Sequence, residues 1–168
     1  MMKAIVYVSE TGHTKKYAEF LGEKIGLPVY DLNTAAKELP GGTEVIYLGW
    51  LMAGTVQGYK KAAKRFEVKV VCGVGMSGDD SQLVDMRKAN RFPDSMPIFY
   101  LQGGFELDKL HGIHKLIMKT MKSTVGKGLA DKQNRTPEED AMLDLLLHGG
   151  DLVSADNLSV IVNWYECR

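Results

Sequence analysis

The sequence predicts an α/β protein built on a doubly wound parallel sheet of five strands. Five short runs rich in β-branched and aromatic residues are nearly continuous in apolar side chains, as in strands that are buried on both faces. Segments with helical spacing separate these runs, and strands that alternate with helices form a parallel sheet covered by helices on both faces. The predicted strands are residues 3–8, 28–32, 44–49, 67–73 and 97–101.

Helical periodicity predicts the segments that connect these strands. The first helix begins near Thr14, and its apolar face consists of Tyr17, Phe20 and Leu21. Apolar residues also recur with this spacing between residues 59 and 66, which predicts a second helix. The remaining predicted segments are a helix at residues 81–91 and a single helical turn at residues 35–39.

The pattern changes after the fifth strand, where a helical insertion of about residues 108–151 is predicted. Residues 108–122 have the spacing of a helix, and the glycines of the sequence G-K-G at 126–128 are expected to end it. The sequence T-P-E-E at 136–139 has the form of a capping box with proline at the first helical position. A C-terminal amphipathic helix then packs on the sheet, so residues 1–168 are expected to form one domain.

Composition restricts the partners and the compartment. The 168 residues include 21 Lys and Arg and 21 Asp and Glu, so the formal net charge is zero, which excludes a strongly basic nucleic-acid binder by bulk charge. Cys72 and Cys167 lie far apart without a metal-binding spacing, which leaves two free thiols or one disulfide. The first apolar run is too short for a membrane span or a signal peptide, so a cytoplasmic protein is expected.

The segment between the first strand and the first helix, S-E-T-G-H-T at residues 9–14, carries the chemistry. The hydroxyls of Ser9, Thr11 and Thr14 join backbone N–H groups at a helix N-terminus, and Gly12 permits a tight turn. The glycine-rich patterns of nucleoside-triphosphate and dinucleotide sites are absent. Such a cradle suits a phosphate monoester, whereas the alternative is an ordinary helix cap.

This strand and loop resemble the phosphate loop of flavodoxin-like proteins, whose common form is [ST]-x-T-G-x-T. The resemblance implies the strand order 2-1-3-4-5, with FMN across the carboxyl ends of the first, third and fourth strands. His13 would either donate to the phosphate or face solvent. The loops after the third and fourth strands match the flavin-flanking loops in position, with Asp79 ending the second. The expected FMN-binding residues in these loops are Trp50, Leu51, Met52, Ala53, Gly54, Met76, Ser77 and Gly78.

The expected flavin ring needs a flat apolar or aromatic wall. Trp50 and Met52 are the candidates for this wall, although Trp50 is equally well explained as a core or interface residue. The second loop contains no tyrosine, which leaves a complete aromatic sandwich around the ring open.

A narrower resemblance covers the C-terminal half. The sequence G-G-F-E at 103–106 and the run H-K-L-I-M-K at 114–119 are similar to menaquinone-dependent protoporphyrinogen oxidases. This implies an FMN oxidoreductase that passes electrons from a substrate to a quinone or other acceptor. The alternatives are a flavodoxin-type electron carrier, which is usually strongly acidic, and a domain without flavin that serves as a binding module. No catalytic residue is assigned.

The predicted helix 108–122 is basic and amphipathic. This pattern predicts contact with a membrane surface, a redox partner or an anionic substrate, and its alternative is a helix packed on the sheet with solvated lysines. His111 and His114 have no supporting carboxylate or cysteine, so no metal site is expected. The charged residues of this helix are Asp108, Lys109, His111, His114, Lys115, Lys119 and Lys122.

Overall fold

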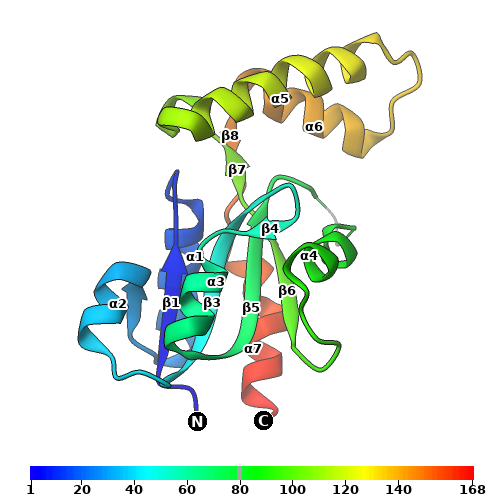
Figure 1. Ribbon diagram of the computed structural model, residues 1–168. Coiled ribbons are helices and arrows are strands. Elements are labelled where there is room, and N and C mark those ends of the chain that lie inside the picture. Colours follow the sequence, from blue (N-terminus) through cyan, green and yellow to red (C-terminus); the bar gives the residue numbers. More distant parts are fainter. Residues whose placement is uncertain (79–80) are drawn as a thin grey trace.

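The computed structural model describes residues 1–78 and 81–168, so Asp79 lies outside the described residues (Figure 1). The central sheet is broadly flavodoxin-like, with five parallel strands in the order β2-β1-β3-β5-β6. A short strand that the sequence did not predict, β4 (Thr55–Val56), pairs antiparallel with the end of β3 and shifts the numbering of later strands by one. The parallel strands are β1 (Ala4–Val8), β2 (Val29–Asp31), β3 (Glu44–Met52), β5 (Glu67–Gly75) and β6 (Ile98–Gln102).

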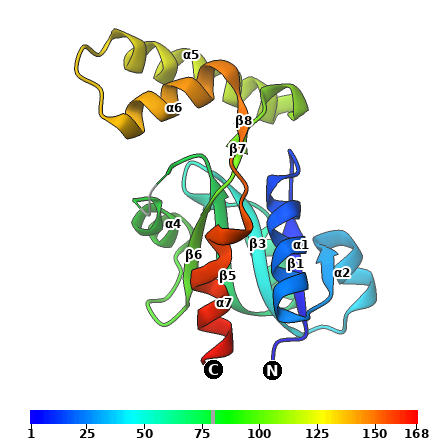
Figure 2. The ribbon, with the colours of Figure 1, turned by 180° about the vertical axis from the view of Figure 1, so that it is seen from behind.

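Helices cover both faces of this sheet, as predicted (Figure 2). On one face, α1 (His13–Ile25) and α7 (Ser159–Glu166) pack on alternate strand residues such as Ile46 and Leu48. The intervening residues, such as Val45 and Tyr47, form a second core with the helices of the other face. These helices are α2 (Leu32–Glu38), α3 (Tyr59–Arg65) and α4 (Gln82–Asn90).

Helix α2 is longer than the single turn predicted for residues 35–39. Its N-cap is Asp31, whose carboxylate accepts hydrogen bonds from the backbone N–H groups of Asn33 and Thr34 at 3.0 and 3.2 Å. A side chain that caps these orphan donors stabilises the first turn. The prediction missed the start of this helix because it extended the strand through Leu32, whereas β2 ends at Asp31.

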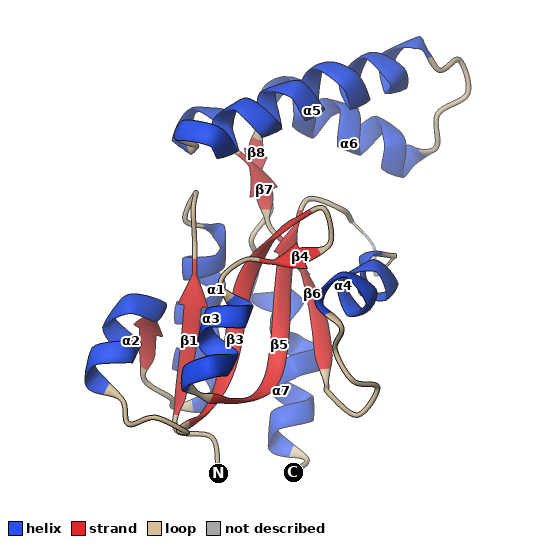
Figure 3. Ribbon diagram, in the orientation of Figure 1, coloured by secondary structure: helices blue, strands red, loops and turns tan. Residues whose placement is uncertain are grey.

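The insertion is an antiparallel helical hairpin on a narrow stem (Figure 3). The stem, which we call the neck, consists of β7 (Gly104–Phe105) paired with β8 (Gly150–Asp151). A 3-10 turn at Leu107–Lys109 leads into α5 (Gly112–Asp131), and α6 (Pro137–His148) returns to the neck. A small separate core around Leu145 and Leu146 holds the hairpin together.

Helix α5 differs from the prediction at both ends. It begins at Gly112 instead of residue 108, and it continues through the glycines at 126–128 to Asp131. Packing against α6 outweighs the low helix propensity of glycine, and Arg135 donates hydrogen bonds to the carbonyls of Leu129 and Ala130 at the end of the helix. The predicted capping box of α6 is confirmed, because Thr136 and Glu139 bond reciprocally.

Two further findings concern the cysteines and the helices. Cys72 is buried in β5, Cys167 is exposed near the C-terminus, and both are free thiols, so the disulfide alternative is wrong. Burial raises the pKa of the Cys72 thiol far above its usual range, which makes it unreactive. In the described part of the chain, no helix combines the length and apolarity that crossing a membrane requires.

Candidate functional site

The loop between β1 and α1 forms a tight turn at the carboxyl edge of the sheet. Gly12 adopts a φ of 99°, and its N–H donates to Ser9 Oγ at 3.1 Å. The Ser9 oxygen therefore closes the loop on itself. No side chain of the described residues caps the start of α1, so the first-turn N–H groups and the positive end of the helix dipole are available to an anion.

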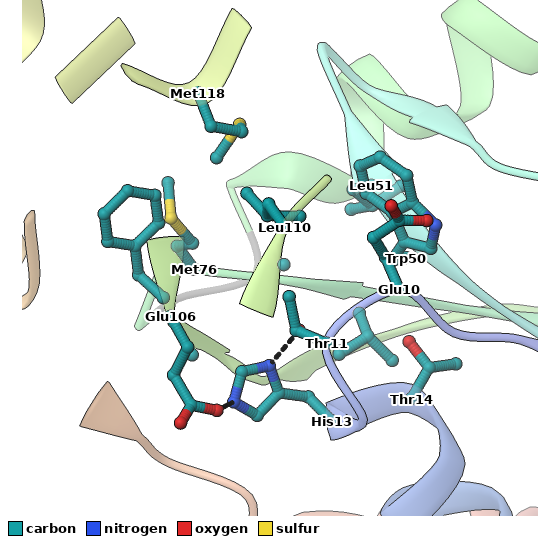
Figure 4. Close-up of a pocket in the computed structure, with 14 residues that line it drawn as sticks. Glu10, Thr11, His13, Thr14, Trp50, Leu51, Met76, Glu106, Leu110 and Met118 are labelled. Carbon is teal, nitrogen blue, oxygen red and sulfur yellow. Dashed lines mark hydrogen bonds and ion pairs between the residues drawn. The ribbon is translucent and has the colours of Figure 1, made fainter. Parts of the chain in front are cut away.

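His13 lies in the first turn of α1 and faces the neck of the insertion (Figure 4). Only 5% of its surface is exposed, so the alternative that it faces solvent is wrong. One ring nitrogen, Nδ1, is 2.8 Å from Thr11 Oγ1. The other, Nε2, is 2.9 Å from Glu106 Oε2 and 3.8 Å from Asp151 Oδ1. Thr14, the other hydroxyl of the predicted cradle, is also buried.

The first predicted flavin-flanking loop is the end of a strand followed by a hairpin turn. Trp50, Leu51 and Met52 belong to β3, and the positive φ angles of Ala53 and Gly54 turn the chain into β4. The side chain of Asn90 in α4 holds this turn, because it donates to the Gly54 carbonyl and accepts from the Val56 N–H, both at 2.9 Å. The turn is therefore a constrained hairpin.

Trp50 contacts the insertion. It is half-buried, and its ring lies edge-on to His114 of α5, with centroids 5.1 Å apart. Trp50 is therefore at an internal interface between the sheet and the insertion. This agrees with the alternative of a core or interface residue.

The second predicted flanking loop follows β5 and includes Met76, Ser77 and Gly78. The Tyr100 hydroxyl of β6 donates to the Ser77 carbonyl at 3.0 Å. Sequence reasoning missed Tyr100. The signal was the expected pairing of its strand with the preceding one, because the carboxyl ends of neighbouring parallel strands, here β5 and β6, meet at one edge. Tyr100 brings to this side of the site the aromatic ring that the loop itself lacks.

Two neighbouring cavities lie between the carboxyl edge of the sheet and the underside of the insertion. The smaller, about 60 Å³, borders Glu10, Thr11, His13 and Thr14 of the predicted phosphate loop (Figure 4). The larger, about 420 Å³, is within the range of small-molecule sites. Five of the nine methionines line the two cavities: Met52, Met76, Met118, Met121 and Met142.

Side chains of the insertion contact the loop at residues 9–14 and the first turn of α1. Glu10 Oε1 is 3.3 Å from His114 Nδ1 of α5, and Lys16 pairs with Asp151 of the neck. His13 lies close to Glu106 and Asp151, as described above. The insertion therefore covers the edge of the sheet where the loop lies, which the sequence did not determine.

Burial and charge oppose each other around His13. Burial lowers the pKa of His13, because it penalises the charged ring, while the nearby carboxylates of Asp151 and Glu106 counteract this effect. Burial would raise the pKa of Asp151, but hydrogen bonds from Lys16 and from the Val153 N–H outweigh it and lower that pKa. Asp151 of the neck and Glu106, which directly follows β7, thus place carboxylates beside a histidine whose pKa is lowered by burial.

Sequence reasoning missed the residues that the insertion contributes. Glu106, Leu110 and Met118 line the smaller cavity, and Met121 and Met142 line the larger one. The signal for Glu106 was its place directly after a strand end, whereas the helical residues became neighbours only through the folding of the hairpin. Within residues 1–78 and 81–168, no cluster of three or more potential metal ligands forms.

No protein-family model matches the chain, and neither a curated protein nor a solved structure matches it.

Proposed function

We propose that this protein is an FMN-binding oxidoreductase, similar to the protoporphyrinogen oxidases, which passes electrons from a substrate to a quinone or other acceptor. One observation carries the proposal: a methionine-lined cavity, covered by the helical insertion, adjoins a hydroxyl-rich loop at the carboxyl edge of a doubly wound sheet. Ligands of such sheets bind at this edge, where the strand order reverses.

The residues at this edge fit the two ends of FMN. At the phosphate end, α1 starts without a side-chain cap, and a Cβ built on Gly12 meets no atom within 4 Å, so the turn is open to an incoming group. At the ring end, the cavity of about 420 Å³ offers thioether and aromatic surface from Met52, Met76 and Tyr100. Thioether sulfur interacts favourably with aromatic rings.

The bound FMN ring would supply the electron-transfer chemistry, and the chain's own residues would bind it and control access. The first-turn N–H groups of α1 and the Thr11 hydroxyl would hold the phosphate. Met118 and Met121 of α5 would shield the ring from water on the insertion side. Exclusion of water would favour a reaction with a substrate held in the same space.

The position of the insertion above the site favours an enzyme instead of the alternative, a flavodoxin-type electron carrier. A carrier exchanges electrons with large protein partners and needs an accessible ring edge. Here α5 covers the larger cavity with Ile117, Met118 and Met121. The neutral net charge also argues against electrostatic steering to a basic partner.

The visible spectrum of the purified protein tests the proposal. A yellow protein, or a colourless one that becomes yellow on incubation with FMN, supports it, whereas failure to bind FMN rejects it. Mixing the reduced protein with a soluble naphthoquinone then distinguishes the two redox functions. Rapid two-electron turnover supports the oxidoreductase, and exchange of single electrons only with protein partners supports the carrier.

We also propose that α5 contacts an anionic membrane surface. Ile113 and Leu116 are 63% and 60% exposed, and Lys115 and Lys119 beside them are exposed as well. Asp131, at the end of α5, is the only acidic residue of this helix. An apolar patch flanked by lysines is complementary to a bilayer that contains acidic lipids, because the lysines attract the headgroups while the aliphatic side chains insert.

A further inference from the structure

His13 connects the phosphate loop to the neck of the insertion through its two ring nitrogens. Nδ1 lies 2.8 Å from the Thr11 hydroxyl, which borders the smaller cavity. Nε2 is buried 2.9 Å from Glu106 Oε2, but it makes no hydrogen bond with any described residue. A buried nitrogen without a hydrogen bond is costly, so its retention beside two carboxylates requires an explanation.

The carboxylates determine which nitrogen of a neutral His13 carries the proton. Glu106 and Asp151 both lie on the Nε2 side, so their negative charge favours a proton on Nε2. Nδ1 is then a hydrogen-bond acceptor, and the Thr11 hydroxyl must donate to it. In this state the single hydroxyl proton of Thr11 is used within the protein and is not available to an anion.

Protonation of His13 reverses this arrangement. Both ring nitrogens then carry protons, so Nδ1 donates to the Thr11 oxygen, and the Thr11 hydroxyl proton becomes free to point into the cavity. The positive charge on the ring is stabilised by Glu106 and Asp151. The same contact at 2.8 Å is therefore compatible with two states, of which only one presents a donor to a phosphate.

We propose that His13 is a positioning residue that switches the Thr11 hydroxyl from a donor toward the ring to a donor toward a bound phosphate monoester. This inference rests on the proposed FMN-binding function and deepens it. The proton that His13 takes up comes from solvent, and no covalent bond to the ligand forms or breaks. Because Asp151 belongs to the neck and Glu106 directly follows it, the position of the insertion is coupled to the phosphate loop.

The direction of the pH effect follows from linkage. Phosphate binding favours the protonated ring, so binding raises the pKa of His13, and the affinity falls as the pH rises through that pKa. The charged groups near the ring are Glu106 and Asp151, which favour its protonation, and Lys16 and Lys109, which oppose it. The phosphate of FMN has its own ionisation near pH 6 and acts in the opposite direction, so a matched variant is required.

The test compares FMN binding by the wild type and by His13→Gln between pH 5 and pH 8, measured by quenching of flavin fluorescence. Glutamine keeps a polar group at this position but does not titrate in this range. The ratio of the two dissociation constants is expected to change by about tenfold across the range, as for the loss of one hydrogen bond to a charged group. Riboflavin, which lacks the phosphate, should show no such change.

A second measurement does not require His13→Gln to fold. NMR titration of the His13 ring in the wild type should show that FMN raises its pKa. A phosphate nearby would also raise this pKa through space, so Thr11→Val serves as the control. This variant keeps the charge effect and removes the hydroxyl, and the rise should be clearly smaller in it.

The outcomes separate the two proposals. Failure of the wild type to bind FMN at any pH rejects the proposed function and this inference together. FMN binding with the same pH profile in wild type and His13→Gln rejects this inference alone. An equal rise of the His13 pKa in wild type and Thr11→Val also rejects it, because charge alone would then explain the rise.

Discussion

At the scale of single residues, neighbouring side chains of the loop at residues 9–14 contact different parts of the fold. Thr11 and His13 are two residues apart, yet Thr11 borders the cavity while His13 reaches the neck of the insertion. Gly12 between them has a φ of 99°, which residues with a Cβ rarely adopt, and this turn lets the two side chains point in different directions.

Replacing both Thr11 and Thr14 by alanine should weaken FMN binding. Each buried phosphate partner that is lost costs roughly 1–3 kcal/mol of binding free energy. Calorimetric titration of the double variant measures this loss. Thr124→Ala, at an exposed position of α5, is the control and should bind FMN as the wild type does. Unchanged affinity in the double variant would count against the assignment of the loop as a phosphate cradle.

Replacing Asp31 by alanine should destabilise the fold by about 1 kcal/mol at pH 7, the usual contribution of an N-cap. The hydrogen bond from the Thr34 hydroxyl, with those from backbone N–H groups, lowers the pKa of Asp31 in the folded state. A lowered pKa gives stability that is complete above the unfolded pKa, near 4, and is lost as the pH falls through the folded pKa.

Urea unfolding at pH 7 and near pH 2 measures this contribution. The difference in unfolding free energy between wild type and Asp31→Ala should shrink on acidification. Glu38→Ala, at the opposite end of α2, should show no comparable loss. A difference that stays constant with pH would mean that the carboxylate charge does not contribute to the cap.

At the scale of elements, the helices of the insertion follow different rules at their ends. The start of α6 obeys a local signal, the capping box at Thr136, so its position was predictable. The end of α5 does not, because the glycines at 126–128 would end an isolated helix. Here the hairpin partner and the Arg135 side chain hold the last turns in place.

The exposed face of α5 should bind vesicles that contain anionic lipid. We expect co-sedimentation with phosphatidylglycerol vesicles, little with pure phosphatidylcholine, and a decrease with rising salt. Ile113→Ser with Leu116→Ser should abolish binding, because the apolar contribution is then lost. Val160→Ser on α7 is a control of similar exposure and should bind normally. Equal binding to neutral and anionic vesicles would contradict the role assigned to the lysines.

At the scale of the whole molecule, the chain has one body with two cores on the faces of the sheet and a small third core in the insertion. The short strands of the neck and the contacts of Glu10, His13 and Lys16 with the insertion connect the third core to the body. The neck is only two residue pairs long, and the exposed Lys16–Asp151 ion pair contributes little to stability, so the insertion is expected to open more readily than the sheet.

Leu146→Ala should loosen the insertion without unfolding the sheet. The Leu146 side chain is fully buried in the third core, and such truncations cost about 2–5 kcal/mol. Amide hydrogen exchange should therefore accelerate in α5 and α6 and stay unchanged in β1 and β3. Leu147→Ala, whose side chain is 52% exposed, is the neighbouring control. Faster exchange throughout the sheet would show that the insertion and the body unfold as one unit.

The strand order was implied only by the resemblance to flavodoxin-like proteins, whereas the sequence by itself determined the alternation of strands and helices, the position of the loop at residues 9–14 and the start of α6. These features depend on local periodicity, turns and caps, which adjacent residues specify. The tertiary structure alone decided that residues 50–56 form a strand end and hairpin, and that the insertion covers the loop. It also decided the environment of His13, because Glu106 and Asp151 are distant in sequence and reach the ring only when the neck pairs.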